Sequence, residues 1–415
     1  SEAIRRGVDV EAFIEYFDEK DATAMREMFN APNCKLRLFC AKSVPKNLLR
    51  TTRSLFWQGA FLYDAAFMAA LDESMRDPEA VLHLETHSAC WPGLKHLDRT
   101  VLNLHYLLNA DMRSEKYHGL RVKWNLHRER QMLKTFKYMA AVTPALAEEV
   151  SLITPTAQLH PVQFGLDLAG YPYAAPSASG DRPLNIGMIG SYAWAPTRAA
   201  ARHFLQLWPY IKQAVKDARL YLVGRGAERI LGDDARAVDP EARVVQNVPD
   251  IIPYFRELDC MVYAPEHASG IKVKVLEAFA LGVPVVTNQH GIDGIPVRHR
   301  EHCIVGSTDA ELVEGVRYLT ENPEVKRQMT QAARKLVEEI CAPSNVFDQW
   351  LAVYAQMNAC KAAKPRMLEP SASPHHGFES PNRAVIIPAC SHCLFRRTAG
   401  RAITSEKWGN PSEAW

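Results

Sequence analysis

The sequence predicts an α/β protein with two doubly wound domains, and three observations support this prediction. The chain has 415 residues, which exceeds the size at which a single hydrophobic core keeps growing. Short apolar segments alternate with segments of helical length, as in repeating βα units built on a parallel sheet. Residues 171–181 (YPYAAPSASGD) are rich in Pro, Ser and Gly, a composition typical of linkers. We therefore expect an N-terminal domain over residues 1–170 and a C-terminal domain over residues 182–356.

The C-terminal domain shows the more regular pattern. We expect its strands at residues 184–189, 219–223, 242–248, 260–264 and 283–287. We expect its helices at residues 196–214, 251–258 and 272–281. Since such sheets bind ligands beyond the carboxyl ends of their strands, candidate site residues are sought in the segments that follow the strands.

The N-terminal domain shows fewer βα units. We expect its strands at residues 8–13, 35–39, 81–84, 100–104 and 138–142. No Gly-rich first βα turn precedes them, so that unit lies upstream of these residues or is absent.

Residues 357–415 have a different composition from the rest of the chain. Most of this tail is rich in Pro, Ser and His and is expected to be disordered. Residues 384–388 (AVIIP) resemble a strand, but we expect it to have no partner. Cys390 and Cys393 form a CxxC, and no second pair follows at zinc-ribbon spacing, so a metal site is not expected there.

Composition and charge exclude several classes of protein. Lys and Arg number 49 and Asp and Glu 47, a net charge of +2 that does not indicate a nucleic-acid partner. Nine scattered cysteines are typical of free thiols in a reducing compartment, so we expect a cytoplasmic protein. No apolar run is long enough to span a membrane, and residues 1–20 lack the apolar core of a signal peptide. Residues 113–137 mix Arg, Lys, Trp and Leu, which fits either a peripheral contact with anionic lipid or a solvated helix face.

The segment 265–288 (PEHASGIKVKVLEAFALGVPVVTN) is the most informative for function. It predicts a loop with Gly270, followed by a helix whose first turns contain Lys272, Lys274 and Glu277. A helix N-terminus after such a loop attracts phosphate. Lys274 and Glu277 share a helix face, which suits a cation contact to a diphosphate and a carboxylate contact to ribose hydroxyls. The alternative is an ordinary surface ion pair on an amphipathic helix.

Residues 276–286 (LEAFALGVPVV) resemble the signature of retaining GT-B glycosyltransferases of family four, also called group one. Residues 187–194 (GMIGSYAW) and 220–226 (LYLVGRG) are similar to the first two strand ends of that family's donor domain. The resemblance implies a GT-B fold, with two Rossmann-like domains facing across a cleft, and catalytic roles for Lys274 and Glu277. The donor contacts that it implies are Gly190, Ser191, Tyr192, Gly224, Arg225, Val248, Ser269, Gly270, Ile271 and Lys272.

Two departures from the family pattern concern the donor site. Ser269 stands where the family often has a first glutamate, so the sugar contact made by that residue is missing. No cation occurs within residues 191–197, where the family has Arg and Lys. Lys274 and Arg198 are expected to balance the diphosphate instead.

The N-terminal candidates follow two neighbouring predicted strands. His105 ends the strand 100–104, where family members often place a histidine that faces the donor sugar. We predict that it is catalytic and faces Gly270 and Ile271 across the cleft. Glu85 and His87 follow the strand 81–84 and are predicted to contact the acceptor.

The resemblance implies a hexosyltransferase that acts with retention and without a metal or cofactor, since no Asp-x-Asp motif occurs. The donor is expected to be a UDP- or GDP-sugar. The acceptor is expected to be a cell-surface glycan or lipid-linked precursor, as in polysaccharide biosynthesis. Two alternatives remain open: a weak or inactive nucleotide-sugar-binding protein, and a GT-B sugar-nucleotide epimerase. An NAD-dependent oxidoreductase is disfavoured because no G-x-G-x-x-G follows a strand.

Overall fold

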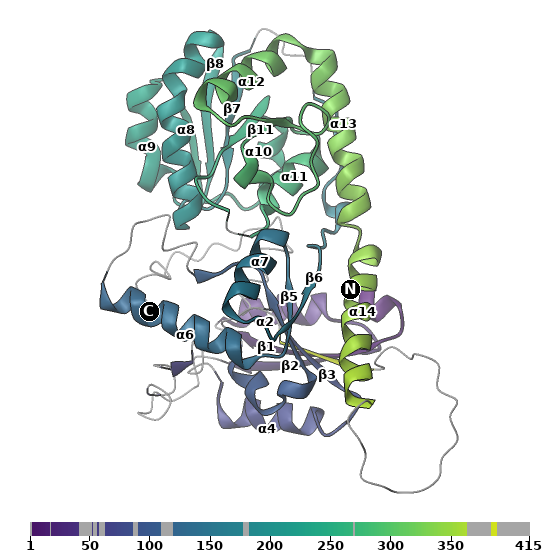
Figure 1. The fold of residues 1–415 in the computed structure, drawn as a ribbon. Helices are drawn as coiled ribbons and strands as arrows, with labels where there is room; N and C mark the ends of the chain where they lie inside the picture. The colour runs from purple at the N-terminus through teal and green to yellow at the C-terminus, as the bar shows by residue number, and fades with distance from the viewer. Residues whose placement is uncertain are drawn as a thin grey trace, which may run out of the picture. The chain divides into compact units, whose positions relative to one another are not determined.

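The structure is a computed structural model that divides into two compact units (Figure 1). The first unit comprises residues 1–105, 119–164 and 343–395, and the second comprises residues 106–118, 165–342 and 396–415. Within these ranges the structure describes residues 2–16, 18–40, 52, 56–57, 63–85, 90–108, 119–176, 182–268, 270–362 and 383–387.

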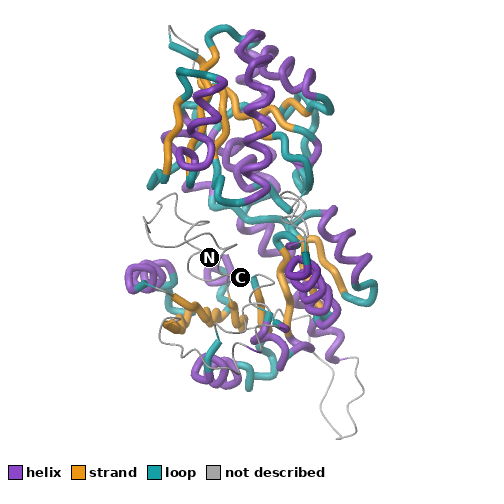
Figure 2. Tube along the Cα trace, turned by 90° about the vertical axis from the view of Figure 1, so that its left-hand side faces the viewer, coloured by secondary structure: helices purple, strands orange, loops and turns teal. Residues whose placement is uncertain are grey.

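The first unit is built on a seven-stranded sheet in the order β2-β1-β13-β3-β4-β5-β6, in which all neighbours are parallel. Figure 2 draws the strands in orange and the helices in purple. The strands of this unit are β1 (Asp9–Tyr16), β2 (Cys34–Cys40), β3 (Val81–Leu84), β4 (Thr100–Leu104), β5 (Tyr138–Ala141), β6 (Gln158–Pro161) and β13 (Arg383–Ile387). Its helices are α1 (Glu2–Arg5), α2 (Glu19–Met28), α4 (Ala65–Ser74), α6 (Leu120–Thr135), α7 (Pro144–Ile153) and α14 (Pro343–Ala362), with short 3₁₀ turns η4 (Trp91–Lys95) and η5 (Leu97–Arg99). The five strands predicted for this domain are confirmed to within a few residues at their ends.

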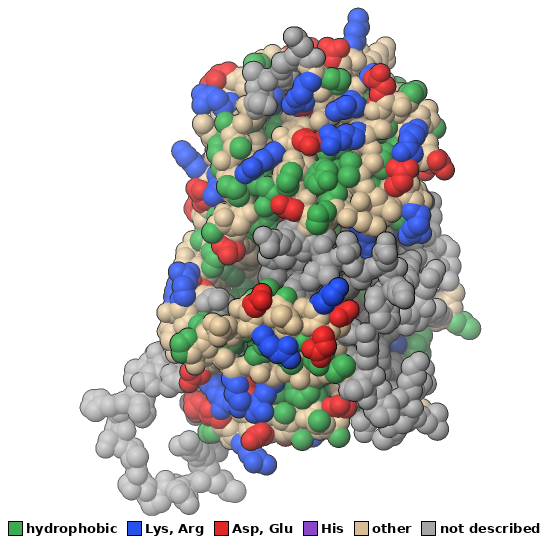
Figure 3. Space-filling model, turned by 180° about the vertical axis from the view of Figure 1, so that it is seen from behind, with side chains coloured by type: hydrophobic (Ala, Val, Ile, Leu, Met, Phe, Trp, Pro, Cys, Tyr) green, Lys and Arg blue, Asp and Glu red, His purple; other side chains and the backbone are tan. Residues whose placement is uncertain are grey.

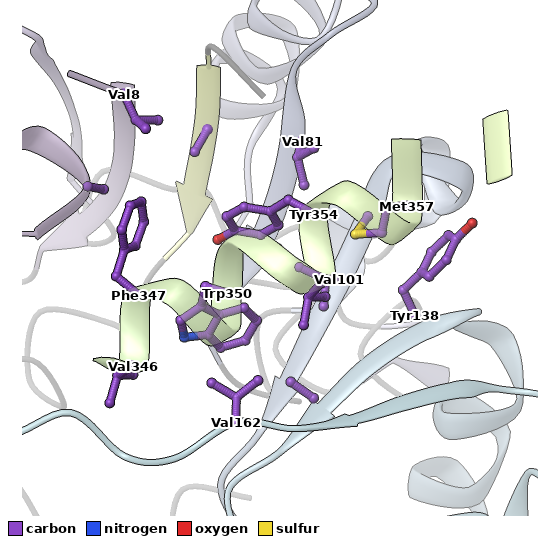
Figure 4. Packing of buried hydrophobic residues seen from close by; sticks show 14 of the residues in the cluster. Val8, Val81, Val101, Tyr138, Val162, Val346, Phe347, Trp350, Tyr354 and Met357 are labelled. Atoms are coloured by element: carbon purple, nitrogen blue, oxygen red, sulfur yellow. The ribbon is translucent and has the colours of Figure 1, made fainter. Parts of the chain in front are cut away.

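Helix α14 packs on the sheet of the first unit, which corrects the predicted end of the C-terminal domain at residue 356. Its residues Phe347, Trp350, Tyr354 and Met357 recur every three or four positions, so they lie on one face of the helix. They are buried in one cluster with side chains of the sheet such as Val81 (Figure 4). The apolar pattern shows that a helix buries one face, but it does not show which sheet covers that face.

The strand-like run near residue 384 has partners on both sides, so the prediction of an unpaired strand was wrong. β13 lies between β1 and β3, with Ala384 opposite Val10 on one side and Val81 on the other. Val385 is fully buried. The expectation of a disordered tail is therefore wrong for residues 383–387, whereas Cys390 and Cys393 lie outside the described residues.

The second unit contains a six-stranded parallel sheet in the order β12-β11-β10-β7-β8-β9. The alternating pattern predicted a parallel sheet and five of these strands, but not β12. The strands of this unit are β7 (Leu184–Ile189), β8 (Ala218–Gly224), β9 (Arg243–Gln246), β10 (Cys260–Tyr263), β11 (Val285–Thr287) and β12 (Ile304–Val305). Its helices are α8 (Ala195–Ala214), α9 (Ala227–Val238), α10 (Ile252–Arg256), α11 (Val273–Leu281), α12 (Asp309–Glu321) and α13 (Pro323–Ile340), with 3₁₀ turns η6 (Leu168–Gly170) and η7 (Gln289–Ile292).

Charges of both signs are mixed over the surface. On the face shown in Figure 3, Lys and Arg side chains alternate with Asp and Glu side chains over the described part of the chain. Among the described residues of this face, no large area has one sign, in agreement with the near balance of charge in the sequence. Among the described helices, none is both long and apolar enough to cross a membrane.

Candidate functional site

The candidate site lies at the carboxyl ends of β7, β8 and β10 in the second unit. β7 has β8 on one side and β10 on the other, and the chain winds outward in both directions from this point. Doubly wound sheets bind ligands where the strand order reverses in this way. Gly190 follows β7, Arg225 follows β8, and the loop of Gly270 leads from β10 to α11. The structure thus brings three of the predicted donor-binding segments to one edge of one sheet.

Two glycines allow the turns after β7 and β8 to approach each other. Gly224 has a φ of +133°, and a Cβ at this position would lie 2.0 Å from the carbonyl oxygen of Gly190. A Cβ on Gly190 would in turn lie 3.2 Å from Cε of Lys274. Side chains at these two positions would displace the turn or the lysine, so glycine is required at Gly224 and favoured at Gly190.

Lys274 is a half-buried cation in the first turn of α11. Its Nζ donates to Oγ1 of Thr197 at 2.9 Å and lies 4.2 Å from the centre of the Tyr263 ring. Burial and the nearby Lys272 lower the pKa of Lys274 to about 7, although Glu277 acts in the opposite direction. The described residues within ion-pair distance of Nζ include no carboxylate, so a bound anion would stabilise the charged form.

Glu277 lies one turn further along α11 and contacts a different partner. The hydroxyl of Tyr171 donates to Oε1 of Glu277 at 3.0 Å. Burial raises the pKa of Glu277 to about 7, while the Tyr171 hydrogen bond and Lys274 act to lower it. The two charged residues are therefore not joined in the surface ion pair that was the alternative interpretation of their spacing.

Tyr171 belongs to the segment predicted as a linker, and the first part of that segment packs on α11. Arg334 donates to the carbonyl oxygens of Tyr171 at 2.6 Å and Ala280 at 2.7 Å. The amide of Ala174 donates to Leu281 O at 3.2 Å. Residues 171–176 are thus part of the second unit, and residues 177–181 lie outside the described residues.

Lys272 was predicted to contact the nucleotide-sugar, but its side chain points into the loop that contains Gly270. Its side chain is almost fully buried, and its Nζ donates to the carbonyl oxygen of Gly270. Burial lowers the pKa of Lys272 to about 8, against the attraction of Asp293. Gly270 has a φ of +74°, the left-handed region that favours glycine. Lys272 therefore holds this loop together and adds positive charge close to Lys274.

Arg225 adds a third cation to the site, after Lys274 and Lys272. It is half-buried, and its Nη1 has no hydrogen-bond partner among the described residues. Burial and the nearby Arg229 lower the pKa of its guanidinium. Ser191 Oγ is likewise buried without a partner in the described part of the chain. Arg198, the other predicted cation, donates from Nη1 to the carbonyl oxygen of Tyr192 at 2.9 Å and so supports the turn after β7.

The remaining predicted donor residues differ in accessibility. The Tyr192 side chain is fully buried and donates to Met188 O at 2.6 Å, and its backbone amide donates to Arg225 O at 2.9 Å, so Tyr192 supports the turn after β7. Val248 is buried beyond the end of β9, and Ile271 is half-buried before α11. Ser269 lies outside the described residues.

In the first unit, the structure joins two of the three predicted residues. Nε2 of His105 lies 3.0 Å from Oε2 of Glu85 at the carboxyl ends of β4 and β3. The His105 ring is largely buried, with 9% of the residue exposed, and Glu85 is half-buried. His87 lies outside the described residues. The orientation of His105 toward Gly270 and Ile271 stays a prediction.

Sequence reasoning missed several residues that contact the predicted ones. They are Tyr171, Thr197, Tyr263, His83 and Asn103. The signal for the last two was present, because residues 81–85 (VLHLE) and 101–105 (VLNLH) show the same alternation, which places every second side chain on one face. Tyr171 gave no signal, because its segment has the composition of a linker.

Comparison with protein families identifies the family to which the larger part of the second unit is similar. The family described as Glycosyl transferases group 1 matches residues 183–322, which include β7, β8, β10 and α11. Residues 183–322 form a group 1 glycosyltransferase domain. Lys274, Glu277, Gly190 and Arg225 all lie within this domain.

Known proteins extend the comparison beyond the group 1 domain. An uncharacterized glycosyltransferase of Haemophilus influenzae is 27% identical over 174 residues, which are 40% of this chain and 47% of that protein. The match thus spans about half the length of that relative. The sucrose-phosphate synthase of Thermosynechococcus elongatus has a TM-score of 0.59 at 14% identity, and 85% of this chain is aligned with all of that structure. Anabaena Alr3699/HepE, solved with UDP and glucose, gives 0.59 at 13% identity over 84% of this chain and all of that structure. The two Rossmann-like units have the GT-B fold, as predicted.

Proposed function

We propose that the chain is a retaining, metal-independent glycosyltransferase that binds a nucleotide-sugar at the carboxyl ends of β7, β8 and β10. The observation that supports this most directly is Lys274, a half-buried cation packed against Gly190 without a carboxylate partner among the described residues. A diphosphate beside it would supply the opposite charge. The N-terminus of α11 and the cation of Arg225 add to the attraction for an anion.

The same groups also assist the departure of the nucleoside diphosphate. As the bond between the anomeric carbon and the diphosphate breaks, negative charge grows on the phosphate oxygen, and Lys274 and Arg225 stabilise that charge. The departing phosphate oxygen takes the proton of the acceptor hydroxyl, and the acceptor oxygen bonds to the anomeric carbon on the same face. Glu277, when ionised, accepts hydrogen bonds from the ribose hydroxyls. The protein thus acts through positioning and charge stabilisation.

Incubation with a panel of UDP- and GDP-sugars tests this proposal. UDP-glucose is the first choice, since the Anabaena structure is described as holding UDP and glucose. We expect slow release of nucleotide and free sugar, and faster release once an acceptor glycan is added. Tight binding without release would instead indicate a nucleotide-sugar-binding protein. Conversion of the bound sugar to its epimer would indicate an epimerase.

The lowered pKa of Lys274 predicts how donor affinity depends on pH. The ammonium is charged below a pH of about 7 and loses its proton above it, so binding a diphosphate at higher pH requires proton uptake. Glu277 titrates near the same pH with the opposite effect on binding, and Glu277→Gln removes that contribution. In this variant we expect UDP-glucose affinity, measured by calorimetry, to fall by up to about tenfold per pH unit between pH 7 and 9.

The matched control for this measurement is the double variant Glu277→Gln with Lys274→Met. It keeps an unbranched side chain at position 274 but has no ammonium there. Its affinity is expected to vary less steeply with pH, and the remaining slope reflects Lys272, whose pKa is about 8. Equal slopes in the two variants would contradict the assignment of the diphosphate contact to Lys274.

We propose further that helix α6 rests on an anionic membrane surface, where a lipid-linked acceptor would lie. Its exposed residues recur at helical spacing and include Leu120, Lys123, Trp124, His127, Arg130 and Lys134. Leu120 is 86% exposed, and Trp124 packs edge-on against the exposed ring of Phe56 at 6.2 Å. A helix that exposes cations together with a tryptophan and a leucine has the character of an interfacial helix.

Sedimentation with lipid vesicles tests the membrane contact. Each cation near an anionic surface contributes about 1 kcal/mol, so replacing Lys123, Arg130 and Lys134 by Ala is expected to weaken binding to phosphatidylglycerol vesicles about a hundredfold. Trp124→Ala is expected to weaken binding to both anionic and neutral vesicles. Lys335→Ala, an exposed lysine on α13, is the control and should bind as the wild type does. Failure of the wild type to bind anionic vesicles would contradict the proposal.

A further inference from the structure

Residues 171–176, which follow η6 in the chain, lie on helices α11 and α13, and these two helices pack against each other (Figure 1). Both backbone groups of Tyr171 are held there. Its amide donates to Leu168 O at 3.1 Å, and its carbonyl oxygen accepts from Nη1 of Arg334 at 2.6 Å. The same nitrogen donates to the carbonyl oxygen of Ala280 at 2.7 Å. The guanidinium of Arg334 thus ties the backbone of Tyr171 to the end of α11.

The side chain of Tyr171 reaches the carboxylate of Glu277 in the last turns of α11. Its hydroxyl donates to Oε1 at 3.0 Å, and no described residue hydrogen-bonds to Oε2. Burial and the carboxylates of Glu277, Asp167 and Asp250 raise the pKa of Tyr171, so its hydroxyl keeps its proton and stays a hydrogen-bond donor. One oxygen of Glu277 is therefore bound by the protein, and the other is left for a ligand.

Glu277 depends on such a partner for both its orientation and its charge. Its side chain is half-buried and makes no ion pair with a described residue. Burial raises the pKa of Glu277 to about 7, so the neutral form competes with the carboxylate, and the Tyr171 hydrogen bond and Lys274 act against this. A hydroxyl that donates to Oε1 favours the ionised form, which accepts hydrogen bonds, and limits the rotation of the carboxylate.

We propose that Tyr171 is a positioning residue of the donor site, which holds Glu277 through Oε1 so that Oε2 faces the ribose hydroxyls of the nucleotide. This role at the ribose rests on the proposed function, in which Glu277 accepts hydrogen bonds from those hydroxyls. Tyr171 acts on the nucleotide through Glu277. The segment before β7 in the chain thus supplies a side chain that supports the donor site, in addition to joining the two repeating halves of the sequence.

Carbon NMR of the whole chain, labelled with ¹³C at Cδ of its glutamates, tests the contact with Glu277 without any ligand. The Glu277 signal is assigned by its loss in Glu277→Gln and should titrate at a pH of about 7, apart from ordinary glutamates at about 4.3. In Tyr171→Phe we expect the pKa of Glu277 to rise by about one pH unit, because a hydrogen bond to the charged form is lost. Tyr173→Phe is the matched control. It removes a hydroxyl of the same segment, which lies 3.3 Å from Oγ1 of Thr330, and should leave the pKa of Glu277 unchanged.

Calorimetry with UDP and its 2′,3′-dideoxy analogue, at a pH of about 8, tests the role at the ribose. We expect Tyr171→Phe to weaken UDP binding about threefold to tenfold and to leave binding of the analogue unchanged, because the analogue has no ribose hydroxyls for Glu277 to accept from. Tyr173→Phe should bind both nucleotides as the wild type does. In a transfer assay, Tyr171→Phe should raise the donor KM by a similar factor with little change in kcat, since the ribose contact is the same in the bound donor and in the transition state.

Two results would overturn the proposal. One is an unchanged pKa of Glu277 in folded Tyr171→Phe, and the other is an equal loss of affinity for UDP and for its dideoxy analogue. A failure of the proposed function gives a different result: the wild type then binds neither UDP nor GDP, although the pKa of Glu277 still responds to Tyr171→Phe. In that case the contact between Tyr171 and Glu277 stands and the role at the ribose is wrong.

Discussion

A chain that ends at Ala362 is expected to lose the fold of the first unit, whereas a chain that ends at Ile387 keeps it. The longer chain includes the strand β13, which pairs with β1 and β3 over four residues on each side. Its removal exposes Val385 and its buried neighbours and leaves the facing backbone groups of β1 and β3 unpaired. Unpaired buried groups cost about 1 to 3 kcal/mol each, so a few of them equal the whole stability of a typical domain.

Hydrogen exchange measures this effect at the affected strands. In the chain ending at Ala362 we expect the amides of β1 and β3 to lose protection, while those of β7 and β8 keep it, because the sheet of the second unit does not include residues 383–387. Donor affinity should survive for the same reason. A point variant, Val385→Asp, buries a carboxylate in the strand and is expected to cost at least about 3 kcal/mol. Full protection of β1 and β3 in the shorter chain would contradict the role of β13.

The two parts of the fold were not equally predictable from the sequence. The sheet of the second unit is made of strands that follow one another within a short stretch of chain. Five of them could be predicted because each is a buried apolar run between a helix and a turn, whereas β12 has only two residues and was missed. β13 shows the same apolar run, but its partners lie at residues 9–12 and 81–84, far away in the sequence. A pattern of apolar residues predicts that a strand needs partners and contains no information on which strands they are.

The candidate site shows the same division. Lys274 and Glu277 could be predicted because their spacing on one helix and the Gly270 loop before it are local features of the sequence. Tyr171, which contacts Glu277, and Thr197, which contacts Lys274, come from other segments, and only the tertiary structure brings them there. The structure also separates residues that the sequence treats alike, since Lys272 is bonded to its own loop while Lys274 reaches the turn after β7.

The replacements Lys274→Ala and Glu277→Gln are each expected to reduce transfer at least about tenfold. A hydrogen bond to a charged group contributes about 1.5 to 3 kcal/mol, and its loss corresponds to a factor of about ten to a hundred. Lys274→Ala should act on both donor affinity and kcat, because charge on the diphosphate is present in the bound donor and increases as the sugar leaves. Glu277→Gln should act mainly on donor affinity, since its proposed partners are ribose hydroxyls. Lys335→Ala provides the same chemical change at an exposed position of the second unit.

Thermal unfolding distinguishes a lost contact from a lost fold in these variants. The folded pKa of Lys274 is about 7, below that of a lysine in an unfolded chain, so between these values the unfolded state binds the extra proton. The charged lysine therefore disfavours the folded state at neutral pH, and its removal is not expected to lower the Tm. Glu277→Gln keeps an oxygen that accepts from Tyr171 and should be nearly as stable as the wild type. Wild-type donor affinity in Lys274→Ala, together with an unchanged Tm, would place the diphosphate away from α11, because no other change at this site could restore the missing charge.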